Sequence, residues 1–336
     1  MRMTPVLVAF QDMYAPVRDD LVLSQRIFDD ELTSVFPFLN DLCETVRSYR
    51  GKMLRPALLL LSARAAGESS PSPCNLGRPH HTLAAVIEMV HMATLVHDDV
   101  LDEADKRRKQ PTIASADGNV AAVLLGDYLI SHAFHLCSSL DSQHASRRIG
   151  ATTNIVCEGE LVQNRRRGDA TLSEADYFEI IRRKTGALTA VACELGAQFA
   201  GADEGTIAAM HSYGLSAGVA FQIMDDVLDI VGDPGTVGKT LERDLAGGKT
   251  TLPMIHCLRH ARPATAEALR SAIGRQNPAA GDRLSDWLAE TGSVDYAVST
   301  AREHVSLALR QLDPLWPSDA KQSLVALAEF MIDRRF

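Results

Sequence analysis

The feature that most limits what this chain can fold into is a pair of matched aspartate-rich motifs in otherwise apolar segments. The first reads HDDVLDE (residues 97–103) and the second reads MDDVLDI (residues 224–230). In a helix, side chains four residues apart lie on the same face, so the first and last aspartates of each motif would project together. The apolar residues inside each motif would attach that helix to a core. We therefore predict that both motifs lie on helices.

The spacing of these aspartates also predicts a bound cation. Like charges four residues apart destabilise a helix by about 0.2–0.5 kcal/mol per pair, and the chain contains the arrangement twice. Carboxylate oxygens suit Mg²⁺, which binds one or two carboxylates together with water and substrate phosphate oxygens. A solvated acidic face explains one such motif as well as a metal does, but it does not explain two matched copies with basic residues nearby. The candidate ligands are Asp98, Asp99, Asp102, Asp225, Asp226 and Asp229.

Basic residues near the first motif suit an anionic ligand. Lys52 and Arg55 lie three residues apart at the expected start of an apolar helix, where the helix dipole favours anions. Two cations at this position oppose the dipole, and a bound phosphate would compensate for that cost. The alternative is that both are ordinary surface cations. Arg107 and Arg108 follow the first motif, and guanidinium groups match phosphate oxygens. We therefore expect a phosphate-bearing ligand close to this motif.

Bulk properties exclude several classes of protein. The chain has 336 residues, and its net charge of −9 and pI of about 5.7 argue against a nucleic-acid partner. The six cysteines have no CxxC spacing and predict reduced, mostly buried thiols. The N-terminal residues lack a signal-peptide pattern, and no run of 18 apolar residues exists. We expect a cytoplasmic protein without a stable membrane anchor.

Most segments carry helical rather than strand periodicity. In residues 20–49, apolar residues recur at spacings of three and four, and alternating runs are hard to find. Residues 67–81 read as a Gly/Ser/Pro loop, and residues 232–250 are too polar and glycine-rich for one buried helix. No segment reads as a flexible interdomain linker. We therefore expect an all-α protein in which residues 1–336 form a single domain.

Taken in order, several segments resemble the trans-isoprenyl (polyprenyl) diphosphate synthase family over nearly the full length of the chain. They are GKMLRP, EMVHMATLVHDDVLDEADKRRKQPT, GDYLIS, EGELVQ, IIRRKTGAL, FQIMDDVLDIVGDPGTVGK and DLAGGKTTLP. The resemblance implies one large helical bundle around a deep central cavity, usually assembled as a homodimer. It also implies that the two aspartate motifs face each other across the mouth of that cavity.

The resemblance also implies roles for individual residues. Two or three Mg²⁺ ions would bind the six aspartates, and the implied catalytic residues are Asp98, Asp99, Asp102, Lys184, Asp225 and Asp226. The diphosphate of an allylic primer would be held by Arg107, Lys184, Thr185, Gln222, Lys239 and Lys249. The positions that match the site for isopentenyl diphosphate are Lys52, Arg55, His91 and Arg108.

Three departures from the family pattern stand out. The family motif usually reads GGKRLRP, whereas Arg50 here replaces its first glycine and Met53 its middle arginine. The lysine and the last arginine of the motif remain, so we still expect an isopentenyl diphosphate site. Residues 242–243 are Glu-Arg in place of small residues, and residues 109–110 are Lys-Gln in place of a turn that contains glycine.

The implied reaction is head-to-tail (1′-4) condensation of isopentenyl diphosphate with an allylic diphosphate. Family members with short products carry aromatic residues four and five positions before the first aspartate, where this chain has Thr94 and Ala93. No Phe, Tyr or Trp occurs from residue 82 to 97, and at about 1.5 Å per residue Ile87 would lie about 16 Å from Asp98 along the helix. We therefore expect a product longer than twenty carbons, with Phe134 forming part of the floor of the tunnel.

Two alternatives stay open at this point. A twenty-carbon (geranylgeranyl) synthase would have its tunnel blocked more deeply, and a subunit of a heteromeric synthase would need a partner chain. The intact aspartate motifs argue against a subunit without catalytic function, and turnover by the purified chain alone would distinguish the two arrangements. A terpene cyclase is disfavoured because the second motif is rich in aspartate and the cations for isopentenyl diphosphate are present.

Overall fold

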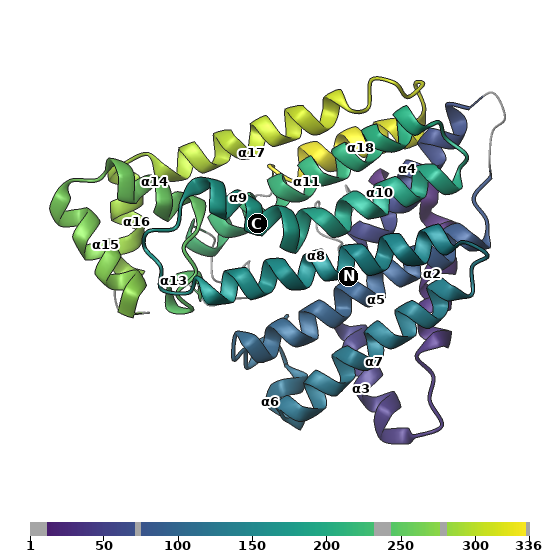
Figure 1. Cartoon of the computed structure of the whole chain (residues 1–336), viewed down its shortest axis with the longest axis horizontal. Helices are drawn as coiled ribbons and strands as arrows, with labels where there is room; N and C mark the ends of the chain where they lie inside the picture. Colours follow the sequence, from purple (N-terminus) through teal and green to yellow (C-terminus); the bar gives the residue numbers. More distant parts are fainter. Residues whose placement is uncertain (1–11, 71–74, 232–242, 276–280, 334–336) are drawn as a thin grey trace. The chain divides into compact units, whose positions relative to one another are not determined.

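The computed structural model describes residues 12–70, 75–231, 243–275 and 281–333, and nearly every element in these ranges is a helix (Figure 1). The strands among them are β1 (Lys106–Arg107) and β2 (Gln110–Pro111), which pair antiparallel as a short hairpin. The predicted all-α class is confirmed. The chain divides into two compact units. Unit 1 contains the described residues of Met1–Thr153, Leu188–Gly214 and Leu309–Leu327, and unit 2 contains those of Asn154–Ala187, Leu215–Ala308 and Ala328–Phe336.

Unit 1 is built around one long helix. Its elements are η1 (Ala15–Val17), α2 (Arg18–Glu31), α3 (Pro37–Tyr49), α4 (Leu54–Glu68), α5 (Arg78–Leu101), the hairpin, α6 (Ile113–Asp117) and α7 (Asn119–Ser138), with parts of α8 (Gln143–Arg165), α10 (Ala187–Phe199), α11 (Glu204–Val231) and α18 (Asp319–Phe330). Helix α5 contacts α2, α3, α4, α6 and α7, and every residue from 80 to 90 on it is buried. A helix that is apolar all round belongs in a core, which fixes α5 as the centre of this unit.

Helices α5 and α7 approach closely at a glycine, and Figure 1 shows them side by side. A Cβ atom at Gly126 of α7 would lie 2.0 Å from Nε2 of His97, so no larger residue fits there without a shift. His97 Nε2 lies 3.1 Å from the carbonyl oxygen of Val123. This contact fixes the end of α5 that carries the first aspartate motif.

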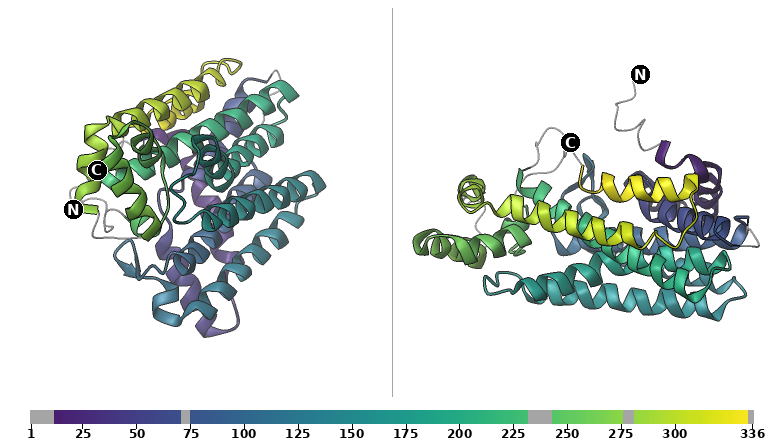
Figure 2. Two further views of the ribbon diagram at one scale, coloured as in Figure 1. Left: turned by 60° about the vertical axis from the view of Figure 1, so that its left-hand side comes forward. Right: turned by 90° about the horizontal axis from the view of Figure 1, so that it is seen from above.

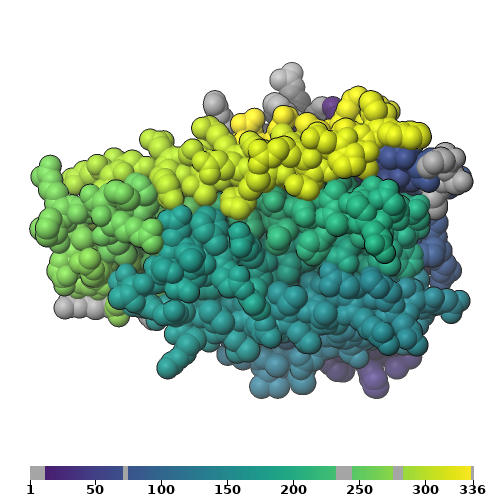
Figure 3. All heavy atoms as spheres, turned by 45° about the horizontal axis from the view of Figure 1, so that its top comes forward, coloured from purple at the N-terminus to yellow at the C-terminus, as the bar shows by residue number. Residues whose placement is uncertain are grey.

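Unit 2 contains α9 (Glu174–Ile181), η2 (Arg182–Gly186), α13 (Arg243–Ala246), α14 (Leu252–His260), α15 (Pro263–Arg275), α16 (Gly281–Glu290) and most of α17 (Ser293–Arg310). One buried cluster joins α9, α11, α14 and α17, and a second joins α14, α15 and α16 around Trp287. Figure 2 shows α15 and α16 in green, and both helices contact α14. One face of α17 is exposed at the surface in the space-filling view of Figure 3, whereas Ala297 and Ala301 on this helix are fully buried.

Helix α7 has the length and mean hydropathy (1.5) of a membrane span, and 33% of that apolar window is buried. A search for an uninterrupted apolar run misses it because Asp127, His132 and His135 interrupt the run. A core helix of a soluble protein passes the same test, so the absence of a membrane anchor stays a prediction. The central cavity and the single domain over residues 1–336 also stay predictions.

Candidate active site

The first aspartate motif occupies the last turn of α5, as its periodicity predicts. Asp99 is only 3% exposed, and its two carboxylate oxygens each lie 3.0 Å from Nε of Arg107, with Nη2 2.8 Å from Oδ1. Asp98 and Asp102 are half-buried, and Asp102 is the C-cap of the helix. Acidic groups at a helix C-terminus oppose the helix dipole, and a cation would compensate for that cost. Within the motif, the middle aspartate therefore binds the protein while the outer two share a face.

Arg107 belongs to the short hairpin, whose two-residue turn has an unusual composition. Arg108 and Lys109 both have positive φ angles, +51° and +69°. A two-residue turn of type I′ requires positive φ at both central positions, which is why glycine or asparagine is usual there. At residues 109–110, where the family has a turn that contains glycine, Lys109 adopts the left-handed conformation that glycine would adopt at lower energetic cost.

The residues predicted to bind isopentenyl diphosphate meet beside this hairpin. Arg55 Nη1 lies 3.0 Å from Nε2 of His91. Because guanidinium groups only donate, the imidazole accepts this bond. Burial, with Arg55 as the next cause, holds the pKa of His91 well below its usual value, so its ring is neutral at pH 7. Lys52 is exposed and follows Gly51, whose Cα lies against the guanidinium of Arg108. The structure therefore brings these four residues into one region of unit 1.

One acidic residue lies close to these cations although the sequence did not single it out. Glu88 is one turn before His91 on α5 and is 2% exposed. Burial raises the pKa of Glu88 to about 7, although Arg55, Arg50 and Arg108 act in the opposite direction. The sequence around Glu88 did not indicate a role in the site, because the nearby arginines approach it only in the folded protein.

The positions predicted to set product length differ in their surroundings. Ala93 is fully buried, and Thr94 is half-buried with its hydroxyl donating to the carbonyl oxygen of His91 at 2.8 Å. Phe134 of α7 is 36% exposed, and its ring lies beside Gly150 of α8. The contribution of Phe134 to a tunnel floor stays a prediction.

The second aspartate motif lies on α11, and its middle aspartate is again held by the protein. Asp226 is 6% exposed and accepts from the Tyr177 hydroxyl at 2.6 Å and from Gln222 Nε2 at 2.8 Å. Thr185 Oγ1 donates to Gln222 Oε1 at 2.6 Å, which completes a chain of four polar side chains. Burial raises the pKa of Asp226 well above its usual value, with Asp244 and Asp225 adding to the effect. Burial likewise raises the pKa of Tyr177, so its hydroxyl stays a donor.

The outer aspartates of this motif are half-buried. Asp229 Oδ2 accepts from the backbone N–H of Asp244 at 3.0 Å, and Lys249 donates its own backbone N–H to the Asp244 carbonyl oxygen at 2.7 Å. These bonds attach the segment that carries Lys249 to the end of α11. The predicted ligand Lys239 and the substituted residue Glu242 lie outside the described residues.

Lys184 lies in a π-helical turn, η2, a geometry that is frequent at functional sites. It pairs with the carboxylate of Glu160 and donates to Gln163 Oε1 at 2.9 Å. A Cβ atom at Gly159 would lie 2.8 Å from the backbone nitrogen of Lys184, so glycine is needed where α8 meets this turn. Glu160 and Gln163 belong to the EGELVQ segment and lie three residues apart. The sequence showed this spacing but did not indicate what the two residues bind.

The donor sets fit a hard divalent ion. Each motif places two carboxylates on one helix face, with a third, buried carboxylate beside them. Mg²⁺ prefers such oxygen donors and completes its coordination with water and phosphate oxygens.

Comparison with known proteins identifies the family of this chain. The profile of the polyprenyl synthetase family matches residues 36–290. The chain is 36% identical over 309 residues to an octaprenyl diphosphate synthase of Haemophilus influenzae, covering 91% of each protein. It is 34% identical over 324 residues to an all-trans-nonaprenyl-diphosphate synthase of Rhodobacter capsulatus, covering 96% and 98%.

A solved structure agrees over almost the whole chain. It is a polyprenyl synthase from Caulobacter crescentus in complex with calcium and isoprenyl diphosphate, with a TM-score of 0.91, 33% identity and coverage of 97% and 98%. The predicted prenyltransferase class is thus confirmed. With helices, motifs and relatives in agreement, this chain belongs to the polyprenyl synthetase family.

Proposed function

We propose that this protein condenses isopentenyl diphosphate head to tail (1′-4) with an allylic diphosphate primer, giving a long-chain all-trans polyprenyl diphosphate and diphosphate. The observation that carries the proposal is the repeated arrangement of the aspartates: a same-face pair on α5 and another on α11, each beside a buried aspartate that protein donors hold. The octaprenyl and nonaprenyl names of the relatives favour a long product over one of twenty carbons.

The proposed enzyme takes two or three Mg²⁺ ions. The proposed ligands are Asp98 and Asp102 on α5 of unit 1, and Asp225 and Asp229 on α11 of unit 2. Asp99 and Asp226 lie beside these pairs, and we propose that they also bind the ions. When bound, the ions neutralise charge that builds up on the departing diphosphate.

The protein's own cations would act on the same leaving group. Arg107 is oriented by Asp99, and Lys184 by Glu160 and Gln163, so both groups lie in defined positions before the primer arrives. Thr185 and Gln222 are ordered by the chain of hydrogen bonds to Asp226. Groups that are already oriented lose less entropy when they bind a ligand. The family resemblance adds Lys239 and Lys249 to these proposed ligands of the allylic diphosphate.

The reaction breaks the bond from C1 of the primer to its diphosphate oxygen, and the electron pair leaves with the diphosphate. The double bond of isopentenyl diphosphate then attacks C1, and a new bond forms between C1 and C4. A proton is lost to the released diphosphate. Lys52, Arg55, His91 and Arg108 would hold isopentenyl diphosphate during this step. The neutral imidazole of His91 can accept from Arg55 without adding charge.

We expect a homodimer that acts in the cytoplasm on isopentenyl diphosphate and an allylic primer, without nucleic acid. The deciding experiment supplies the purified chain with Mg²⁺, labelled isopentenyl diphosphate and a fifteen-carbon primer, and measures product length by chromatography. Products well beyond twenty carbons support the proposal. Arrest at twenty carbons would favour the geranylgeranyl alternative, and no turnover with both substrates bound would point to a required partner chain.

A further inference from the structure

We propose that Arg50 is a positioning residue for isopentenyl diphosphate: Asp29 anchors its side chain, and its carbonyl oxygen orients the guanidinium of Arg108. This inference rests on the proposed function, because it assigns a role within the proposed isopentenyl diphosphate site. Arg50 is also the residue that replaces a glycine in the motif of this family. The replacement thus adds a side-chain anchor at a position where glycine has none.

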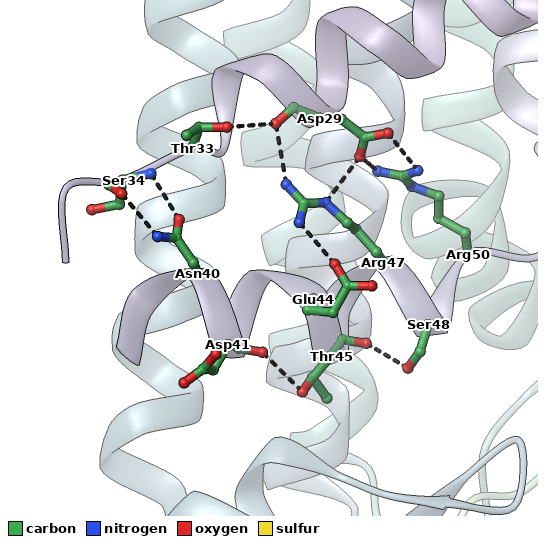
Figure 4. Close-up of polar contacts among 10 residues, drawn as sticks. All are labelled: Asp29, Thr33, Ser34, Asn40, Asp41, Glu44, Thr45, Arg47, Ser48 and Arg50. Carbon is green, nitrogen blue, oxygen red and sulfur yellow. Dashed lines mark hydrogen bonds and ion pairs between the residues drawn. The ribbon is translucent and has the colours of Figure 1, made fainter. Parts of the chain in front are cut away.

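The anchor is a single carboxylate shared by two arginines, as Figure 4 shows. Arg50 Nη1 donates to Asp29 Oδ2 at 3.2 Å, and its Nη2 donates to Oδ1. Arg47 Nε donates to the same Oδ1 at 3.0 Å, and its Nη2 donates to the Asp29 carbonyl oxygen at 3.2 Å. Asp29 lies near the end of α2, so these bonds connect α2 to the point where α3 ends.

Burial makes the Arg50 interaction the more constrained of the two. The Arg50 side chain is 10% exposed, against 25% for Arg47. Its guanidinium lies 4.3 Å from the ring centroid of Phe28, which is fully buried. A desolvated guanidinium over an aromatic face gains from the ring quadrupole and needs its carboxylate partner. The side chain of Arg50 therefore has one well-defined position.

The backbone of Arg50 carries this constraint to Arg108. Arg50 is the C-cap of α3, with φ −54° and ψ 128°, so the chain leaves the helix there. Its carbonyl oxygen accepts from Arg108 Nη1. A Cβ atom at Gly51 would lie 2.2 Å from Arg108 Nη2, so the guanidinium packs directly against this segment. Moving the backbone of residues 50 and 51 would consequently move the charge of Arg108.

The same segment also presents the next proposed ligand. Lys52 follows directly, and Met53 adopts a left-handed conformation (φ +51°) as the N-cap of α4. Two cations predicted to bind one diphosphate thus depend on the placement of a single short segment. An ordered segment lowers the entropic cost of binding that diphosphate. Without the Asp29 anchor, we expect weaker binding of isopentenyl diphosphate and little change for the allylic primer.

The test compares Arg50→Ala, Asp29→Asn and the conservative Arg50→Lys with a matched control, Arg47→Ala. Arg47 binds the same carboxylate but makes no bond to Arg108. We expect Arg50→Ala and Asp29→Asn to raise the KM for isopentenyl diphosphate about tenfold, a change equal to the loss of one modest interaction. The KM for the primer and kcat should stay within about threefold, and Arg50→Lys should recover part of the loss.

Calorimetric binding of isopentenyl diphosphate without primer separates this inference from the proposed function. If the wild-type chain binds it but yields no product, the proposed function fails, and the dissociation constants of the variants still test the anchor. The anchor is refuted if Arg47→Ala weakens binding as much as Arg50→Ala, or if the KM values of both substrates rise together. Thermal denaturation of all four variants shows whether each one is folded.

Discussion

Replacing Glu194 with glutamine should destabilise the protein strongly at neutral pH. Glu194 of α10 is 8% exposed and connects three helices of unit 1. Its Oε1 accepts from Arg148 Nε of α8 at 2.6 Å. Its Oε2 lies 2.5 Å from Arg148 Nη2 and 2.7 Å from His211 Nδ1 of α11. Removing the carboxylate charge would leave the half-buried guanidinium of Arg148 without its ionic partner.

The size of the effect follows from the pKa of Glu194. Burial acts to raise this pKa, but the hydrogen bonds from His211 and Arg148 outweigh burial and lower it to about 2, from an ordinary value of 4.5. At 1.36 kcal/mol per pH unit, that displacement corresponds to about 3 kcal/mol of folding free energy. Because the folded pKa is depressed, this stability is fully present above pH 4.5 and is lost as the pH falls towards 2.

Urea denaturation at pH 7, 4.5 and 3 measures this contribution. Glu194→Gln should lower the free energy of unfolding by about 3 kcal/mol at pH 7, and the deficit relative to the wild type should shrink as the pH falls. Glu68→Gln, at an exposed carboxylate at the end of α4, serves as the control and should show no such deficit. A deficit below about 1 kcal/mol, or one that is the same at pH 7 and pH 3, would refute the reasoning.

Three further predictions concern the site. Tyr177→Phe removes the 2.6 Å bond to buried Asp226 and should cost about 1–3 kcal/mol of stability and lower kcat/KM for the primer, measured by denaturation and steady-state kinetics. Thr94→Phe and Ala93→Tyr should both shorten the product, as measured by chromatography, and unchanged product lengths would contradict this. Ala93→Tyr should also lower the stability of the protein, because Ala93 is fully buried. Lys109→Gly should raise the unfolding free energy by about 1 kcal/mol, and a decrease would show that φ +69° is not costly.

The sequence was sufficient to predict the helical class and the helices that carry the motifs. Helical periodicity depends on local spacing, and α5 and α11 lie where that spacing placed them. The different roles within each motif could not be predicted. Asp99 binds Arg107 eight residues away, but Asp226 binds Tyr177 from 49 residues away. Spacing shows which face an aspartate occupies, whereas its partner depends on which helix packs against that face.

Tertiary contacts also account for what sequence reasoning missed around Lys184. Lys184 lies in the π-helical turn η2, and no local propensity marks such a turn. Glu160 and Gln163 reach Lys184 only because Gly159 lets α8 approach the turn. The glycine and the spacing were visible in the sequence, but the helix that they would meet was not.

An acidic chain with a net charge of −9 must still attract two diphosphates, and the arrangement of acids around its arginines explains how it can. Glu88 faces the field of Arg55 and Arg108, but burial raises its pKa to about 7, which weakens its negative charge at neutral pH. Asp29 forms ion pairs with Arg47 and Arg50, where it serves as an anchor. Arg55 and Arg108 thus contribute positive charge where isopentenyl diphosphate is proposed to bind. Local burial, rather than overall composition, sets the sign of the field at this site.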